Sequence, residues 1–540
     1  MMHRTAASTA APTPVTDLVT DLLRPEAYPA PWPANVELRE THVSTVFLTE
    51  GDVYKVKKPV NLGFLDFTTL AARQRACEAE LILNTRLAVG AYLGLVPVRL
   101  DEAGRHHLGP AGEVVDWAVH MLRLPDPVRA DVRLAAGTLT ASHLDATASM
   151  LADFHARAAS VDAGRWGTVA AIGQNVTDNF AAFDVSASGL VTPEEGREIE
   201  RWQLDQLRER ARTFERRLEK GRVRDGHGDL RLEHLYCGDA GELTIIDCIE
   251  FSDRFRNADV CADVAFLSMD LAAHGRVDLA ERFLARYARA ANDFDLYSVV
   301  DFYEAYRAYV RAKVAMITAQ QATGVHRERA RIEARRHFVL ALSAGRRSLL
   351  TPAVVAVGGI IASGKSTVAE ALGDRLSAPV IDADRTRKHL LGLAPTTHDA
   401  SQAFEGAYDP AMTERVYAEL MLQASTVLES GRPVVLDASF RTEELRRAAR
   451  DLAHEHGVPF LMVECRARPE ICRERLLRRE RESSVSDGRL AIFDAFCARV
   501  EEVLELPSAE RLIVDTEAPL AATVAVLESR LQTWPAGLTS

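Results

Sequence analysis

The chain has 540 residues, which is too long for one ordinary core and predicts at least two domains. Hydrophobic residues make up 47% of it and charged residues 26%, a composition typical of a globular protein that buries a sizeable core. The formal net charge of -12 argues against broad binding to nucleic acid or to an anionic membrane.

The cysteines and the apolar runs indicate a cytoplasmic protein. The seven cysteines are scattered and contain no CxxC pair, which favours reduced thiols. Residues 1–34 are predicted to be a mobile tail and lead-in, because they lack the apolar stretch of a signal peptide. The longest apolar run, "AVVAVGGIIA" from Ala353, has half of the roughly 20 residues that a membrane-spanning helix needs. It predicts a buried strand instead.

The elements expected from residue 35 onward begin with a hairpin. The runs "STVFLTE" and "DVYKVKK" predict two strands that turn at Gly51-Asp52, and "AARQRACEAELILNTRLAVGAYL" predicts a helix after them. Residues 137–220 have a helical pattern with breaks that stops near Gly221, and residues 263–348 are almost wholly helical in pattern. This order predicts a small β-rich lobe followed by a larger helical lobe.

A second domain is predicted after a boundary near residues 345–351, where Pro352 disfavours a helical conformation before it. Beyond it, short apolar runs alternate with helices in "AVVAVGG", "APVIDAD", "PVVLDASF", "PFLMVECR" and "RLIVDTE". That alternation favours an α/β domain over residues 352–540, with a mainly parallel sheet covered on both faces.

The stretch "VAVGGIIASGKST" matches the phosphate-binding pattern GxxxxGK[ST] after a predicted strand and before a predicted helix. Backbone N–H groups of such a loop point at phosphates, the lysine neutralises the β and γ phosphates, and the serine hydroxyl binds Mg²⁺. A chance glycine-rich turn is the alternative. The pattern predicts ATP and Mg²⁺ as cofactors, with the binding residues Gly359, Ser363, Gly364, Lys365, Ser366 and Thr367.

Acidic residues follow two neighbouring strands of this domain. In "VIDADRTRKHLLG", Asp382 and Asp384 are candidates to orient or deprotonate an acceptor hydroxyl, and Arg387 is a candidate to hold an anionic group. Helix capping by Asp384 is the structural alternative. In "VVLDASF", Asp437 is a candidate to hold Mg²⁺ through water, or it is a strand-end turn residue.

A later helix, "RPEICRERLLRRERES", carries Arg475 and Arg479 on one face, where solvated surface is the default interpretation. Together these stretches resemble the small-molecule P-loop kinases related to gluconate kinase and the zeta-toxin group, across residues 352–540. The resemblance implies that Arg475 and Arg479 belong to a lid over the ATP phosphates. It also implies catalytic roles for Lys365 and Asp384, with Asp384 and Arg387 on the acceptor side.

The N-terminal part has a second group of candidate residues. "HGDLRLEHLYC" contains His227 and Asp229, and "IIDCIEF" places Asp247 at the end of an apolar run. We expect the two acids on adjacent hairpin strands, facing one cavity. An Asp-rich loop that is only a turn, with Asp259 and Asp263 capping the next helix, is the structural alternative.

These motifs resemble the catalytic loop HxDxxxxN and the metal-binding IDxE of aminoglycoside phosphotransferases and choline kinases. The resemblance spans residues 35–345 and implies a bilobal α+β protein-kinase-like fold. It implies that Asp229 is catalytic and accepts the proton of a hydroxyl, and that Asp247 holds Mg²⁺. Lys55 would pair with phosphates and Glu80 would hold that lysine, with Lys57 as a rival; His227 would support the loop.

The chain departs from this family at two places. His234 occupies the position of the metal-binding Asn, and imidazole is a poor ligand for Mg²⁺. The hairpin "ETHVSTVFLTEGD" lacks the glycine-rich pattern of protein kinases.

The leading hypothesis is a fusion of two ATP-using modules, a bifunctional phosphotransferase/ATP-binding protein that phosphorylates small hydroxylated molecules. One alternative is a regulatory P-loop ATPase controlled by a degenerate kinase-like ligand-binding domain. A polynucleotide or toxin-like kinase is the other alternative, which the acidic net charge disfavours. The sequence names neither acceptor and leaves the oligomeric state open.

Overall fold

The computed structural model describes residues 17–61, 65–161, 163–181, 189–344, 350–394, 397, 408–479 and 490–533, with the side chains of Ala163, Arg479, Gln532 and Thr533 left out. The chain divides into two compact units. One comprises residues 1–140 and 225–258 and is called the β unit here; the other comprises residues 141–224 and 259–540 and is called the P-loop unit. The domain ranges taken from the sequence stay predictions.

The β unit is built on a six-stranded antiparallel sheet with the order β1-β2-β3-β6-β4-β5. The predicted hairpin is confirmed, because β2 and β3 pair antiparallel around Gly51. Helix α2 (Leu70–Asn84) is capped by Thr69, whose hydroxyl accepts the N–H of Ala72. The helix is shorter than predicted, since strand β4 already begins at Tyr92. The strands are β1 (Glu37–Glu40), β2 (Ser44–Leu48), β3 (Asp52–Lys57), β4 (Tyr92–Leu100), β5 (His106–His107) and β6 (Glu113–Leu122).

A short antiparallel hairpin of β8 (Leu235–Cys237) and β9 (Leu243–Ile245) also belongs to the β unit. The prediction that Asp229 and Asp247 lie on its strands is wrong: Asp229 precedes β8 and Asp247 follows β9. Both acids still lie at the same end, since Leu235 pairs with Ile245. The remaining elements are α1 (Leu18–Leu22), η1 (Pro25–Ala27), η2 (Asp126–Val128), α3 (Ala130–Ala136), η4 (Leu232–His234) and α9 (Asp253–Arg256).

The described residues of 141–219 and 261–343 are mostly helical, as predicted, and α7, α10, α12 and α13 share a buried core around Phe266, Tyr309 and Phe338. The carboxylate of Asp259 accepts the N–H of Cys261, the first residue of α10, at 2.8 Å, so the expected contact of Asp259 with the start of this helix is present. Asp259 also pairs with the buried Arg217 at 2.7 Å, and Asp263 lies inside the first turn of α10. The elements are α4 (Ala141–Arg157), α5 (Ala163–Trp166), α6 (Val169–Ala181), α7 (Pro193–Glu209), α8 (Ala211–Glu219), α10 (Cys261–Ala273), α11 (Val277–Ala291), η5 (Phe294–Ser298), α12 (Val300–Gln321) and α13 (Gly324–Ser343), with β7 (Val223–Asp225) and β10 (Asn257–Asp259) where the chain changes units.

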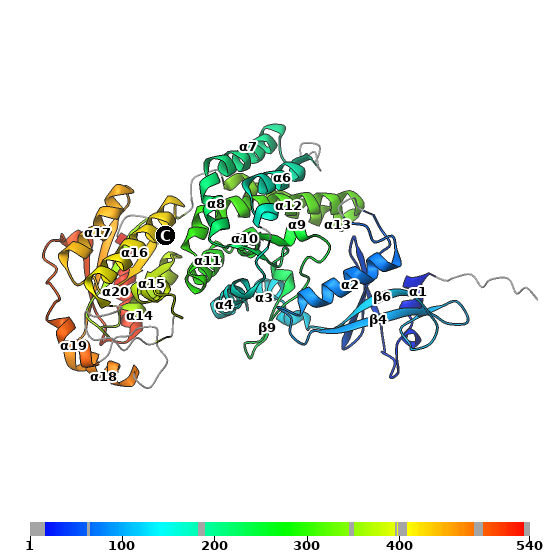
Figure 1. Ribbon diagram of the computed structural model, residues 1–540, viewed down its shortest axis with the longest axis horizontal. Helices are drawn as coiled ribbons and strands as arrows, with labels where there is room; N and C mark the ends of the chain where they lie inside the picture. Colours follow the sequence, from blue (N-terminus) through cyan, green and yellow to red (C-terminus); the bar gives the residue numbers. More distant parts are fainter. Residues whose placement is uncertain are drawn as a thin grey trace, which may run out of the picture. The chain divides into compact units, whose positions relative to one another are not determined.

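The rest of the P-loop unit is an α/β fold with a parallel sheet, as predicted. Its five strands have the order β12-β13-β11-β14-β15, and Figure 1 labels the helices α14 to α20 of the same fold. Its strands are β11 (Val354–Gly358), β12 (Val380–Asp382), β13 (Val434–Asp437), β14 (Phe460–Arg466) and β15 (Arg511–Asp515). Its helices are α14 (Lys365–Leu376), α15 (Ala383–Leu390), α16 (Pro410–Glu429), α17 (Glu443–Glu455), α18 (Pro469–Arg479), α19 (Leu490–Cys497) and α20 (Leu520–Thr533), with η7 (Ser508–Glu510) before β15.

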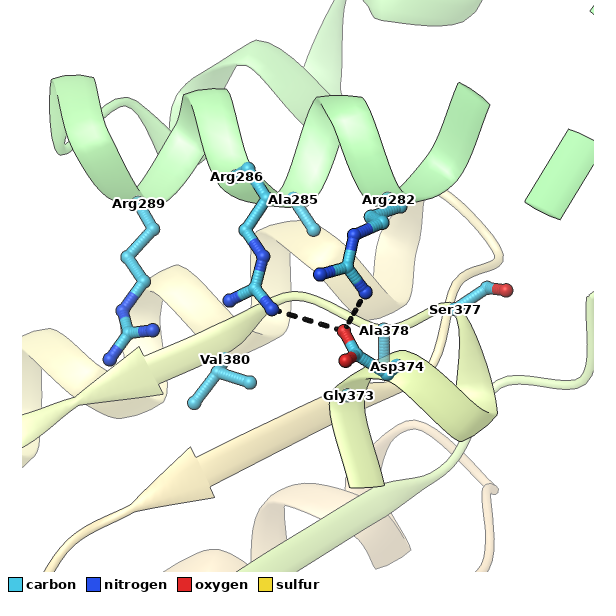
Figure 2. Close-up of a pocket in the computed structure, with 9 residues that line it drawn as sticks. All are labelled: Arg282, Ala285, Arg286, Arg289, Gly373, Asp374, Ser377, Ala378 and Val380. Atoms are coloured by element: carbon cyan, nitrogen blue, oxygen red, sulfur yellow. Dashed lines mark hydrogen bonds and ion pairs between the residues drawn. The ribbon is translucent and has the colours of Figure 1, made fainter. Parts of the chain in front are cut away.

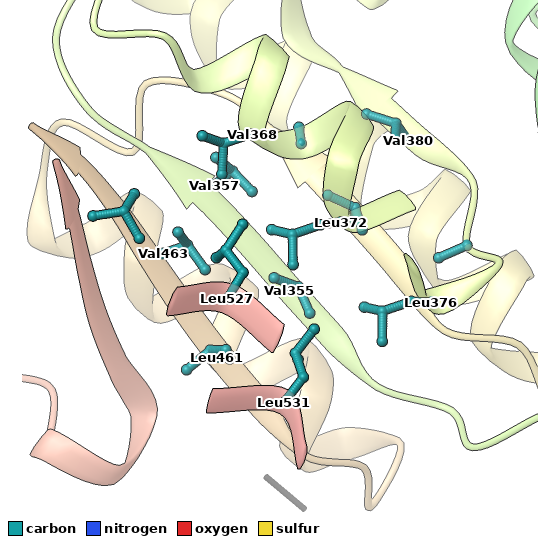
Figure 3. Packing of buried hydrophobic residues seen from close by; sticks show 14 of the residues in the cluster. Val355, Val357, Val368, Leu372, Leu376, Val380, Leu461, Val463, Leu527 and Leu531 are labelled. Atoms are coloured by element: carbon teal, nitrogen blue, oxygen red, sulfur yellow. The ribbon is translucent and has the colours of Figure 1, made fainter. Parts of the chain in front are cut away.

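The core of this sheet fixes the helix that follows the P-loop. Val355 and Val357 of the central strand pack against Leu372 of α14 and Leu527 of α20, all with no more than 3% of their surface exposed (Figure 3). Burying aliphatic side chains on both partners stabilises the arrangement by about 1.5–3 kcal/mol per side chain. The N-terminus of α14 is therefore held rigidly at the carboxyl edge of the sheet.

Two further features of the described residues concern membrane-spanning helices and cysteines. In the described part of the chain, no helix is long and apolar enough to cross a membrane. All seven cysteines are free thiols, as predicted.

Candidate functional site

The loop between β11 and α14 has an open, glycine-dependent conformation. Gly359 and Gly364 have φ angles of 144° and 87°, and a Cβ on Gly359 would lie 2.5 Å from the carbonyl oxygen of Cys465. Ser366 and Thr367 are exposed at the start of α14, and the ammonium of Lys365 donates to the carbonyl of Ile360 at 2.8 Å. An accessible helix N-terminus with a lysine and hydroxyls can bind phosphate groups.

Ser363 supports this loop from within. Its side chain is fully buried, and its carbonyl accepts a hydrogen bond from the hydroxyl of Thr516 at 2.6 Å. Its backbone N–H donates to the carbonyl of Ile360 at 3.2 Å, so Ser363 is held within the loop.

The predicted acids meet at one edge of the sheet. Asp382 and Asp437 are partners in the parallel pairing of β12 with β13. Burial and the charge of Asp382 raise the pKa of Asp437, while Lys365 and a hydrogen bond from Ser366 lower it, and the resulting pKa is about 6. Thus one carboxylate, one hydroxyl and the P-loop lysine lie together.

Asp382, not Asp384, caps helix α15, since its carboxylate accepts the N–H of Arg385 at 2.7 Å. Burial raises the pKa of Asp382, against the charges of Arg289 and Arg385. Asp384 is more exposed and accepts a hydrogen bond from Arg387 at 2.9 Å. Of the two acids, Asp384 is therefore the more accessible to an acceptor.

Arg475 reaches the P-loop from α18. Its guanidinium donates to the carbonyl of Ala362 at 3.2 Å and to that of Thr516 at 2.5 Å. Arg475 thus contacts the backbone of the P-loop, and its role in a lid over the ATP phosphates stays a prediction. Arg479 stands at the end of the same helix, but its side chain lies outside the described part of the structure.

Helix α11 presents a row of arginines to the helix after the P-loop (Figure 2). Arg282 and Arg286 both pair with Asp374 of α14, at 2.5 and 3.1 Å. Arg286 and Arg289 also pair with Glu370, one turn closer to the P-loop. Arg289 extends the row to Asp382, with 3.2 Å between its Nε and the carboxylate. The row therefore connects the helical part of the unit to both α14 and β12.

Arg432 makes the reverse connection. It precedes β13, is 5% exposed, and donates to Glu281 of α11 at 2.8 Å and to Asp301 of α12 at 2.9 Å. These ion pairs bind the parallel sheet to α11 and α12, the helices that precede and follow η5 in the chain.

The candidate site of the β unit is a buried network of charges. Lys55 of β3 lies 2.8 Å from Glu80 of α2 and 2.6 Å from Asp247. Lys57 also pairs with Glu80, at 2.6 Å, and with Glu250. Burial alone would raise the pKa of Asp247, but Lys55 and His234 outweigh it and hold that pKa well below its ordinary value. Both lysines therefore share Glu80, and only Lys55 reaches Asp247.

Asp229 is engaged by its own loop. Arg231 donates to both carboxylate oxygens of Asp229 at 3.1 Å. His234 donates from Nδ1 to the carbonyl of Asp229 at 2.8 Å, so its Nε2 is left to accept from Arg231 at 3.2 Å. His227 is buried and bonded to the carbonyl of Ile246 at 3.0 Å, which agrees with a supporting role.

The two sites differ in how well they fit Mg²⁺. Among the described residues, no group of three or more His, Cys, Asp and Glu side chains is arranged to hold a metal ion. At the P-loop, the hydroxyl of Ser366 and the carboxylate of Asp437 suit an ion that prefers oxygen and keeps several waters. In the β unit, Asp247 is bound to Lys55 and the imidazole of His234 to Arg231, so this arrangement does not fit Mg²⁺.

The chain has a relative in Mycobacterium tuberculosis strain H37Rv named "Uncharacterized protein Rv2004c". The two sequences are 34% identical over 477 residues, which cover 88% of this chain and 92% of the relative. The chain belongs to the Rv2004c family. The family model described as "AAA domain" matches residues 354–503 of this Rv2004c-family chain, which include the P-loop and the acids.

Two solved structures resemble parts of this Rv2004c-family chain. A gluconokinase from Sinorhizobium meliloti 1021 is 20% identical, with a TM-score of 0.26, and covers 35% of this chain and 95% of its own. Aminoglycoside 2'-phosphotransferase-IIIa in its GDP complex is 13% identical, with a TM-score of 0.35, and covers 59% of this chain and 97% of its own.

Sequence reasoning missed the residues that engage the predicted acids. Arg231 stands inside the quoted motif of this Rv2004c-family chain, and its position two residues after Asp229 was the available signal. Arg289 gave no such signal, because it comes from a helix more than 90 positions away in sequence.

Proposed function

We propose that the chain is an ATP-dependent phosphotransferase that works at the P-loop site on a small hydroxylated acceptor. The observation that carries this proposal is the juxtaposition of Ser366 and Lys365 with Asp437, at the edge where Asp382 ends the neighbouring strand and Asp384 lies in the first turn of the helix after it. A site that only bound nucleotide would not need an accessible carboxylate beside the phosphate loop.

In the proposed reaction, Lys365 and Arg475 hold the phosphates, and Ser366 with Asp437 would hold Mg²⁺. When bound, Mg²⁺ neutralises charge on the phosphate oxygens. The acceptor oxygen forms a bond to the γ-phosphorus while the bond between that phosphorus and the β,γ-bridging oxygen breaks, and ADP leaves with that oxygen. Asp384 takes the proton of the acceptor hydroxyl, and Arg387, which already binds Asp384, positions that carboxylate.

The test is transfer of label from γ-labelled ATP to a panel of hydroxylated metabolites by the full chain. We expect a labelled product that Lys365→Ala abolishes and Asp229→Asn leaves in place. Asp229→Asn is the matched control because it changes the acid of the other unit. An unlabelled panel, or equal labelling by Lys365→Ala, would count against the proposal.

For the β unit, one observation favours the regulatory alternative over a second phosphotransfer site. Both of its acids are already paired with cations, Asp229 with Arg231 and Asp247 with Lys55. We propose that this unit binds a ligand and controls the P-loop site. Calorimetry should then show ligand binding to the full chain without Mg²⁺, whereas labelled product lost in Asp229→Asn alone would favour a second catalytic site.

A further inference from the structure

Three arginines from three segments gather on the acceptor side of the P-loop site. They are Arg387 of α15, Arg441 in the loop after β13, and Arg499 just after α19, and they are called the arginine cluster here. The N–H of Glu501, two residues after Arg499, donates to the carbonyl of Arg441 at 2.8 Å, so these two segments lie side by side. In agreement, burial lowers the pKa of Arg441, and the charges of Arg499 and Arg387 lower it as well, against the effect of Tyr417.

The fold explains why these arginines meet. Since Asp382 lies opposite Asp437 in parallel strands, the segments that leave β12 and β13 start at the same edge of the sheet. Arg446, only 1% exposed, then fixes the third segment: it donates to the carbonyls of Phe440 at 3.1 Å and of Glu502 at 3.2 Å. The backbone segments that carry Arg441 and Arg499 are therefore bound to each other.

Arg387 retains unused hydrogen-bonding capacity. Its guanidinium lies over the ring of Tyr408 at 4.2 Å, and one of its nitrogens donates to Asp384. The residue is 6% exposed, and its Nε is a buried donor with no hydrogen-bond partner among the described atoms. A buried, unsatisfied donor of a cation, placed near two further cations, costs free energy that an anion would recover.

We propose that the arginine cluster binds an anionic group of the acceptor, so that the substrate is a small hydroxylated molecule carrying a phosphate, sulfate or carboxylate. This inference rests on the proposed phosphotransfer at the P-loop. It adds Arg441 and Arg499 to the site as residues that determine specificity for charge.

The γ-phosphoryl group of ATP is a second source of the same chemistry. The sheet order separates the two: Arg387 and Arg441 follow β12 and β13 on one side of the P-loop strand, and the segment of Arg499 is bound to that of Arg441. Arg475 approaches the loop from α18, after β14 on the other side. Lys365 and Arg475 are thus already available to the nucleotide, and the cluster lies beside Asp384, where the acceptor hydroxyl is placed.

The probe is inorganic sulfate, titrated at constant ionic strength into the full chain saturated with Mg²⁺ and AMP-PNP, with the melting temperature as readout. Saturation by AMP-PNP is established first, and its absence in the wild type would be a failure of the proposed function itself. We expect one saturable sulfate site that Arg441→Gln weakens by about tenfold or more. Arg441→Lys should recover part of the affinity, and Arg447→Gln, at a 64% exposed position on α17, should change nothing.

Three results would overturn the proposal. The first is the absence of saturable sulfate binding to the nucleotide-loaded wild type, and the second is equal binding by Arg441→Gln. The third is loss, in Arg441→Gln, of the preference for AMP-PNP over ADP, which would assign the cluster to the γ-phosphoryl group.

In the labelling assay, acceptors carrying an anionic group should be phosphorylated at least about tenfold faster than the same polyols without it; the opposite order would also contradict the proposal.

Discussion

Arg289 of helix α11 lies 3.2 Å from the carboxylate of Asp382, at the end of strand β12. A residue of the helical segment thus directly contacts an acid of the P-loop site. Asp382 also caps α15, the helix that carries Asp384 and Arg387. The position of the acceptor-side residues therefore depends on a helix that precedes the P-loop by some 70 residues.

Replacing Arg289 by glutamine should slow phosphotransfer about tenfold without weakening nucleotide binding, because Arg289 contacts Asp382 and not the loop. Arg289 lowers the pKa of the buried Asp382, so its loss should move the ionisation of that acid, and the rise of activity, to higher pH. Turnover measured across pH checks this. Arg276→Gln, which removes a 40% exposed arginine paired with Asp278, is the control; an unchanged pH profile in Arg289→Gln would refute the prediction.

Replacing Gly359 by alanine should abolish nucleotide binding. Its φ of 144° is strained for any L residue, and the added Cβ would approach the carbonyl of Cys465 within 2.5 Å. Gly457→Ala is a matched control, since that glycine has a φ of 63° with nothing within 4 Å of an added Cβ. Both variants should lose about 1 kcal/mol or more of stability, but only Gly359→Ala should lose the rise in melting temperature that ADP causes in the wild type.

Replacing Lys55 by methionine should destabilise the β unit by about 1.5–3 kcal/mol, because Glu80 and Asp247 would each lose a charge-assisted hydrogen bond while Lys57 still pairs with Glu80. Urea unfolding followed by tryptophan fluorescence measures the change. Lys58→Met, at a position paired with the exposed Glu40, should cost little. The double variant Lys55→Met, Asp247→Asn should recover part of the loss, and strictly additive effects would show that the two residues do not interact.

Glu304 makes stability depend on pH in a specific direction. Burial raises its pKa from 4.5 to about 8, and it accepts a hydrogen bond from Ser268. Between these values the unfolded chain releases a proton that the folded chain retains, so this group lowers stability as pH rises. The free energy of unfolding of Glu304→Gln, minus that of the wild type, should therefore rise by up to about 1.4 kcal/mol per pH unit from pH 5.5 to 7.5. A difference that stays constant over this range would contradict the assignment.

The order and type of the elements could be predicted from the sequence because they depend on local patterns. The β-branched runs became β11 to β15, and GxxxxGK[ST] became an open loop at a helix N-terminus. The structural alternative took Asp384 as the helix cap, but Asp382 has that role, because α15 already begins at Ala383 and local pattern does not fix a helix start to one residue. The partners of the acids were less accessible to prediction, since Arg289 meets Asp382 only after the helices have packed.

The ion pairs between α11 and the P-loop helix bear on how the chain can be divided. A cut at residues 345–351 would leave Arg282, Arg286 and Arg289 on one fragment and Glu370, Asp374 and Asp382 on the other. Each fragment would then expose a patch of one sign, complementary to the patch on the other. Separately produced fragments should accordingly recombine in dilute buffer and separate in concentrated salt, so a fragment beginning at residue 352 would be a poor substitute for the intact chain.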